Sequence, residues 1–315
     1  PGAAAAAGSS SGAGRLSLVY ENDLFANTDQ QFTNGVFLRY ETATDDPPRA
    51  ARALGAAVAA VSPGDRIRLG LGASHAIYTP EDITLPDPAP DDRPYAGLAL
   101  LSAGLIAAEP GRQDVWTLEI GLVGPAAGGE EIQTFVHDRV VGEDPRGWDA
   151  QLGDEPVFRA MYDQTRRVAL AQDLFGAGVE ADALPRASIA LGTLETSAAA
   201  GFSLRVGRGL RGDFGSARGL RGVAGVDFGR GAGVDWALHV SADGLLVGRN
   251  LLLDGNTFRS SRSVDKKTAV GSLGVGASAS WGRTTVGYQQ IFRSPEFEGQ
   301  GGWTSYGSVR LSVRF

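Results

Sequence analysis

The chain has 315 residues, including 45 glycines and 15 prolines, and its mean hydropathy is −0.09. It contains no run of about 18 or more apolar residues, which excludes a transmembrane helix, and no cysteine, which excludes disulfides and thiolate chemistry. The formal net charge of −7 argues against nucleic acid as a partner, because phosphate binding requires a basic surface.

Residues 1–14 are almost all alanine, glycine and serine. This composition is typical of the sequence around a signal-peptide cleavage site. We therefore interpret 1–14 as a disordered tail, and we expect one domain over 15–315.

The remainder of the chain shows repeated alternation of apolar and polar residues, which is the pattern of a strand with two different faces. About twelve segments of this kind occur, an even number within the range of bacterial barrels. They begin at Leu16, Val36, Ile67, Tyr95, Val115, Pro156, Pro185, Ser197, Val234, Ala269, Arg283 and Tyr306.

The terminal segment carries the strongest pattern. Val309, Leu311, Val313 and Phe315 are apolar, and the residues between them are arginine or serine. Such a strand suits lipid on one face and water on the other, whereas a soluble sandwich strand would expose the terminal aromatic side chain. The pattern predicts an all-β fold: a transmembrane antiparallel β-barrel in the bacterial outer membrane, surrounded by outer-membrane lipid and inserted by the barrel assembly machinery.

Two stretches depart from the strand pattern. In residues 130–142 apolar side chains recur near helical spacing, which predicts a short helix near the extracellular rim of the barrel. On this helix Gln133 and His137 are four residues apart and share a face. Proline and aspartate cluster in Thr79 to Arg93, which predicts a long extracellular loop.

The three histidines are the candidate bases at neutral pH. His75 and His239 lie in predicted strands, where we interpret them as wall residues. His137 lies on the predicted helix beside Glu131 and Gln133, where it is either a surface histidine or a catalytic base.

A second group of polar residues lies at the ends of the first two strands. If these strands pair as a hairpin, Asn22 and Asp23 face Thr33 across one rim of the barrel. Carboxylate, amide and hydroxyl oxygens suit a hard cation such as Ca²⁺. Asparagine, aspartate and threonine are also ordinary turn residues, so a polar turn is the other interpretation.

Several motifs in this order resemble those of the outer-membrane lipid A 3'-O-deacylase family (LpxR family). The motifs are Glu21-Asn-Asp-Leu-Phe25, Phe32-Thr-Asn-Gly35, Asp92-Arg-Pro-Tyr-Ala-Gly97, residues 124–133 with His137 and Gly142, Trp148 with Gln151, residues 249–258, and the terminal strand.

The resemblance implies a Ca²⁺-dependent hydrolase that removes the 3'-acyloxyacyl chain of lipid A. It implies that His137 is the general base, that Asn22, Asp23 and Thr33 belong to the catalytic centre, and that Ca²⁺ would stabilise the oxyanion. As further candidates we take Glu131, with Asn22 and Asp23, for the metal and Gln133, Arg93 and Arg139 for the substrate. We expect a monomer whose partner is lipid A or lipopolysaccharide.

One loop departs from the family pattern. Where the family resemblance implies a lysine-rich loop for lipid A phosphate, residues 80–90 are acidic and rich in proline. Two alternatives therefore stay open: another outer-membrane lipid hydrolase, such as a phospholipase with a serine nucleophile, and a non-enzymatic barrel.

Overall fold

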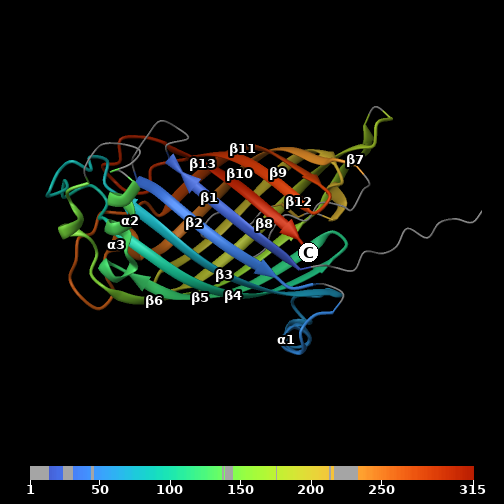
Figure 1. Ribbon diagram of the computed structural model, residues 1–315, viewed down its shortest axis with the longest axis horizontal. Helices are drawn as coiled ribbons and strands as arrows, with labels where there is room; N and C mark the ends of the chain where they lie inside the picture. The colour runs from blue at the N-terminus through green and yellow to red at the C-terminus, as the bar shows by residue number, and fades with distance from the viewer. Residues whose placement is uncertain are drawn as a thin grey trace, which may run out of the picture.

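The computed structural model describes residues 14–23, 31–43, 46–136, 138, 145–174, 176–212, 214–215 and 233–315. Over these ranges the chain forms an elongated barrel of tilted strands (Figure 1). None of the helices in these ranges is long and apolar enough to cross a membrane.

The strands are β1 (Arg15–Asn22), β2 (Gln31–Glu41), β3 (Arg66–Thr79), β4 (Ala96–Glu109), β5 (Arg112–Val123), β6 (Glu155–Arg166), β7 (Val168–Leu174), β8 (Val179–Gly192), β9 (Glu195–Arg208), β10 (Asp235–Asn250), β11 (Ala269–Trp281), β12 (Thr284–Arg293) and β13 (Thr304–Arg314). Apart from β6 and β7, which do not pair with each other, each strand pairs antiparallel with its neighbours in chain order, and β1 also pairs with β13.

The barrel closes through a strand that is interrupted at one residue. Only Arg167 separates β6 from β7, and both pair antiparallel with β8, β6 through Arg159 to Thr165 and β7 beyond it. Counting β6 and β7 as one, the 13 strands of the described ranges form twelve barrel strands. The predicted fold and strand number are thereby confirmed, and each predicted strand segment overlaps an observed strand.

The faces of the barrel wall are the reverse of those of a soluble protein. Leucine, valine, isoleucine and phenylalanine side chains point outward and are exposed, among them Leu101 at 62% and Leu246 at 64%. Arginine, glutamate, aspartate and serine side chains point inward and are buried, among them Arg39, Glu119 and Asp182. An apolar exterior and a polar interior suit a wall with lipid outside, because hydrocarbon cannot solvate charged groups.

The helices mark the two ends of the barrel (Figure 1). α2 (Gly129–Val136) and α3 (Leu251–Asp254) lie at one end, called here the α2–α3 end. α1 (Arg49–Val58) lies at the other end with Phe315, called here the terminal end. Short 3₁₀ turns occur at Pro125–Ala127, Trp148–Ala150 and Leu210–Gly212.

α1 was not predicted by the strand pattern. Its sequence, RAARALGAAV, is rich in alanine and follows Pro48, which is favourable at a helix start. The predicted helix in residues 130–142 is confirmed as α2, while residues 137 and 139–142 lie outside the described residues. The predicted tail falls almost entirely outside them as well, in residues 1–13.

Long connections at the α2–α3 end pack on one another and cover the barrel end. Arg262 donates hydrogen bonds to Asp87 and to the carbonyl oxygen of Pro88, which joins the β10–β11 connection to the β3–β4 loop. Asn256 bonds both the amide and the carbonyl group of Gly153. The predicted loop at Thr79 to Arg93 is thus an ordered part of this cover.

Candidate active site

The first hairpin brings together several polar groups on the outer face of the wall. Asn22 and Asn34 are direct partners in the β1–β2 ladder, and both side-chain amides donate to the Tyr20 hydroxyl oxygen, at 3.0 and 3.3 Å. Tyr20 and Asn22 share the strand face of Leu16 and Leu18, which are exposed apolar residues. The polar group therefore continues the lipid-facing surface at the α2–α3 end.

Thr33 joins this group through an irregularity in β2. The β2–β3 register shifts between Phe32 and Asn34, and the Thr33 hydroxyl lies 2.8 Å from that of Thr79 at the end of β3. Asp23 follows β1 directly and is 1% exposed. The predicted cluster of Asn22, Asp23 and Thr33 thus lies at the adjoining ends of two paired strands.

Close glycine contacts hold α2 against the wall. A Cβ atom on Gly97 of β4 would lie 2.9 Å from the backbone nitrogen of Gly129, the first residue of α2. A Cβ atom on Gly129 would lie 2.7 Å from the Trp148 ring, which in turn packs on Tyr95 with ring centroids 4.8 Å apart. Only glycine lets the helix start so near the strand, so these motif residues build the seat of α2.

The candidate residues on and near α2 have different environments. Gln133 is buried, and its side-chain oxygen accepts a hydrogen bond from Trp148 Nε1 at 2.9 Å. Glu131 is exposed in the first turn of the helix. His137 and Arg139 lie outside the described residues. His75, on the outer face of β3, is 2.8 Å from the carbonyl oxygen of Ala127 and fixes the approach to the helix.

Arg93 lies on the luminal side of the wall. It is 1% exposed, its guanidinium lies 3.7 Å from Glu296, and it stacks over the Tyr78 ring at 4.7 Å. Burial lowers the pKa of Arg93, and the negative charge of Glu296 opposes that shift. The structure therefore places Arg93 in an ion pair and does not bring it to the outer-face group of Asn22 and Thr33.

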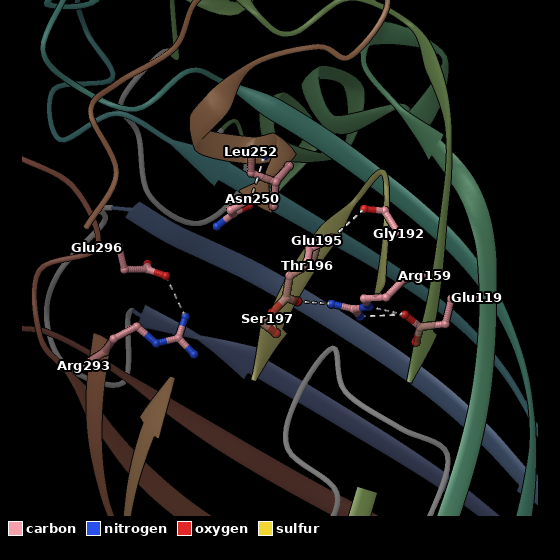
Figure 2. A network of polar contacts seen from close by, with 10 residues as sticks. All are labelled: Glu119, Arg159, Gly192, Glu195, Thr196, Ser197, Asn250, Leu252, Arg293 and Glu296. Carbon is pink, nitrogen blue, oxygen red and sulfur yellow. Dashed lines mark hydrogen bonds and ion pairs between the residues drawn. The ribbon is translucent and has the colours of Figure 1, made fainter. Parts of the chain in front are cut away.

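The lumen is filled by networks of charged residues (Figure 2). Arg159 donates to Glu119 at 2.6 and 2.8 Å and to Glu195 at 2.6 Å, and Arg293 pairs with Glu296 at 3.3 Å. These residues, apart from Glu119, border a luminal cavity of about 230 Å³. Because each arginine already has a carboxylate partner, the networks account for the polarity of this cavity.

The cover at the α2–α3 end is acidic, and several of its cations are neutralised within it. Arg262 pairs with Asp87, Lys266 with Asp254 at 2.8 Å, and Lys267 with Glu298 at 2.9 Å. In the β3–β4 loop, hydrogen bonds from Thr84 lower the pKa of the exposed Asp82. These pairs neutralise the charges of Arg262, Lys266 and Lys267, which lowers the positive charge that the cover offers to an anionic headgroup.

The described residues contain no group of three or more His, Cys, Asp or Glu side chains that could hold a metal ion. The adjoining ends of β1 and β2 supply other donors: the Asp23 carboxylate, the Asn22 side-chain carbonyl and the Thr33 hydroxyl. These are all oxygen atoms, the ligand type that Ca²⁺ prefers.

Two members of the outer-face group were missed from the sequence. Tyr20 was not singled out as a site residue, although its position two residues before Asn22 in a strand places both side chains on one face. Thr79 was assigned to a loop boundary. The contact between Thr79 and Thr33 could not be predicted from the sequence, because it depends on the register shift in β2.

The reversed faces, the closed antiparallel wall and the polar group at the edge of the lipid-facing surface define an outer-membrane β-barrel protein of bacteria. A family model described as "Outer membrane protein LpxR" matches residues 2–315. The chain belongs to the LpxR family.

Solved structures support the fold. LpxR from Salmonella typhimurium is 20% identical, with a TM-score of 0.77, over 96% of this chain and 100% of that one. The β domain of the Bordetella autotransporter BrkA is 12% identical, over 96% and 98% of the two chains, but its TM-score is only 0.44. The comparison with curated proteins returned no match.

Proposed function

We propose that this protein is an ester hydrolase that removes the 3'-acyloxyacyl chain of lipid A. Membership of the LpxR family supports this activity. The observation that carries it is the polar group of Tyr20, Asn22 and Thr33, which lies on the lipid-facing side of the wall beyond exposed Leu16 and Leu18. A lipid ester near the headgroup of a membrane-embedded substrate reaches this position without leaving the bilayer.

We infer the orientation of the barrel from the connections that cover its α2–α3 end. At the terminal end, β4 and β5 are joined by residues 110–111 and β11 and β12 by residues 282–283, while residues 42–65 and 209–234 form two longer connections at that end. At the α2–α3 end the loops 80–95, 124–154 and 251–268 are long. Outer-membrane barrels have short periplasmic turns and longer extracellular loops, which supports an extracellular α2–α3 end and a site in the outer leaflet.

In the proposed reaction, water attacks the ester carbonyl and His137 accepts its proton, then returns it to the leaving alkoxide. The Asn22 amide is held by Tyr20 and fixes the geometry of the site. Gln133, four residues before His137, is locked by Trp148 and keeps α2 in a single position relative to the wall. We infer that this positioning sets the distance between base and ester.

The oxygen donors of this group fit Ca²⁺. Asp23 and Asn22 are almost completely buried, and the Asn22 side-chain nitrogen donates to the Tyr20 hydroxyl oxygen. Asp23, Asn22 and Thr33 would hold the ion, with Glu131 of α2 as a further carboxylate. The ion would supply charge stabilisation for the ester oxyanion.

The test is mass spectrometry of lipid A after incubation with membranes that hold the wild type, His137→Ala or the control His239→Ala. We expect the wild type and the control to remove a mass equal to one acyloxyacyl group. His137→Ala should lower the rate by about 10²–10⁴-fold, the usual contribution of a general base. Removal of Ca²⁺ with a chelator should also abolish the mass loss.

Other results would select the alternatives. Intact lipid A together with cleaved phospholipid, sensitive to a serine-reactive inhibitor, would identify a phospholipase-like enzyme. Intact lipid A and intact phospholipid, with a correctly folded barrel, would identify a non-enzymatic barrel.

A further inference from the structure

α1 lies outside the barrel wall at the terminal end (Figure 1). Its buried residues are Ala51 and Gly55, and a Cβ atom on Gly55 would lie 3.2 Å from two side-chain atoms of Ile67 in β3. Ile67 lies on the same strand face as Leu71, which is 54% exposed. The helix therefore rests on the lipid-facing side of the wall.

The segment that follows α1 is tied to the same side. Trp116 Nε1 of β5 donates to the Ser62 hydroxyl at 2.8 Å, and Arg112 donates to the carbonyl oxygen of Val61 at 2.6 Å. Trp116 shares its strand face with Leu118, which is exposed and apolar. Contacts with β3 and β5 thus hold the helix and the segment after it at the edge of the apolar exterior.

The exposed surface of α1 is divided into two sides. Leu54 of α1 and Val61, which lies in the turn after the helix, are apolar and are 50% and 56% exposed. Arg49 and Arg52 lie on the other side, are exposed, and Arg52 pairs with Asp46 at 3.6 Å. An apolar side next to a charged side is the pattern of a helix that lies in a membrane interface.

We propose that α1 is an interfacial helix that binds the phospholipid leaflet at the terminal end of the barrel. Leu54 and Val61 enter the boundary between headgroups and acyl chains, and Arg49 and Arg52 face the water. The occupant is lipid because the apolar side of α1 is continuous with the lipid-facing wall at Ile67. This proposal depends on the barrel fold and is independent of the catalytic activity.

The chain has no cysteine, so single cysteines can be introduced and labelled without removing native ones. Spin labels at Leu54→Cys and Val61→Cys are compared with a label at Ala56→Cys, which lies on the side of α1 opposite Leu54. The full-length barrel is reconstituted in vesicles of phosphatidylethanolamine and phosphatidylglycerol. Heat-dependent mobility on gels confirms that each labelled barrel is folded.

We expect labels at positions 54 and 61 to be more accessible to oxygen, which partitions into lipid, than to a water-soluble nickel chelate. The label at position 56 should show the reverse. Equal preference for the nickel chelate at all positions would overturn the proposal, because the helix would then lie in water. Spin–spin broadening that disappears on dilution with unlabelled protein would also overturn it, since a second copy would then cover the apolar side.

Discussion

Among individual residues, Tyr20 has the most informative position, because its hydroxyl oxygen accepts hydrogen bonds from both Asn22 and Asn34. Tyr20→Phe removes this acceptor from the buried side-chain amide of Asn22 and the half-buried one of Asn34. A hydrogen bond is worth about 0.5–1.5 kcal/mol, so we expect the deacylation rate to fall about tenfold.

The matched control is Tyr288→Phe, which removes an exposed hydroxyl that bonds Gln290 on β12. Rates of acyl release from lipid A are measured for both variants at equal amounts of folded barrel. An unchanged rate in Tyr20→Phe would show that the amides do not need the phenol for catalysis.

At the scale of elements, the contact between α2 and β4 positions the helix that precedes His137. Gly97→Val places a side chain against the Gly129 backbone, where no flexible group can move aside. We expect α2 to be displaced and the deacylation rate to fall at least tenfold, since small misplacements of catalytic groups are costly. The barrel should still show heat-dependent mobility on gels.

Gly244→Ala is the control for this variant, because a Cβ atom there meets nothing within 4 Å. It replaces a strand glycine without touching the α2 seat. Equal activity of Gly97→Val and Gly244→Ala would refute the role of the glycine contact.

The acidic cover at the α2–α3 end predicts a weak affinity for phosphorylated headgroups. Asp87→Asn removes one negative charge and releases Arg262 from its ion pair. We expect KM for bisphosphorylated lipid A to fall about two- to fivefold with kcat unchanged, because an exposed ion pair is worth at most about 1 kcal/mol. Asp65→Asn, an exposed aspartate at the terminal end, should leave KM unchanged.

Kinetics on bisphosphorylated and dephosphorylated lipid A test this prediction. Added salt should reduce the difference in KM between Asp87→Asn and the wild type. A KM that is the same for Asp87→Asn and the wild type would show that Arg262 does not reach the headgroup.

At the scale of the whole molecule, the Glu119–Arg159–Glu195 network spans the region where the barrel closes through β6 and β8 (Figure 2). Arg159→Met leaves two buried carboxylates without their shared cation. Breaking a buried ion pair costs about 3–5 kcal/mol, so we expect a clear decrease in the free energy of unfolding. Urea unfolding in lipid vesicles, followed by gel mobility, measures it.

The control is the triple variant Arg159→Met, Glu119→Gln, Glu195→Gln, which removes the charges together. It should recover most of the lost stability, because none of the three positions then carries an uncompensated charge. Equal instability of the single and triple variants would mean that packing of the arginine stem, and not its charge, stabilises the closure.

The barrel was predictable because strand alternation is a local property of the sequence. Leu311 and Val313 point outward and Arg310 and Ser312 inward, as their order along β13 requires. The break at Arg167 and the register shift beside Thr33 were not predictable, because each depends on how neighbouring strands pair. α1 was not predicted because its alanine-rich sequence has no strand pattern. Its position on the wall depends on the contact of Gly55 with Ile67, which the sequence does not show.

The candidate site was likewise predictable only in part. Asn22, Asp23 and Thr33 lie together at the ends of the first two strands, as the predicted hairpin suggested, because paired strands end at one rim. The side of the wall on which Arg93 lies could not be read from a loop sequence, since it depends on Tyr78 and Glu296 from separate elements. The role of His137 stays a prediction.

The pairing of β1 with β13 has a consequence for when the protein acts. Asn22 is opposite Asn34 in β2 on one side and Gly307 in β13 on the other, so the rim that carries the candidate site is complete only after β1 has paired with β13. An unassembled chain in transit would have an open edge at this point. We therefore expect hydrolysis to be switched on by assembly itself, which protects lipid outside the destination membrane without a separate inhibitor.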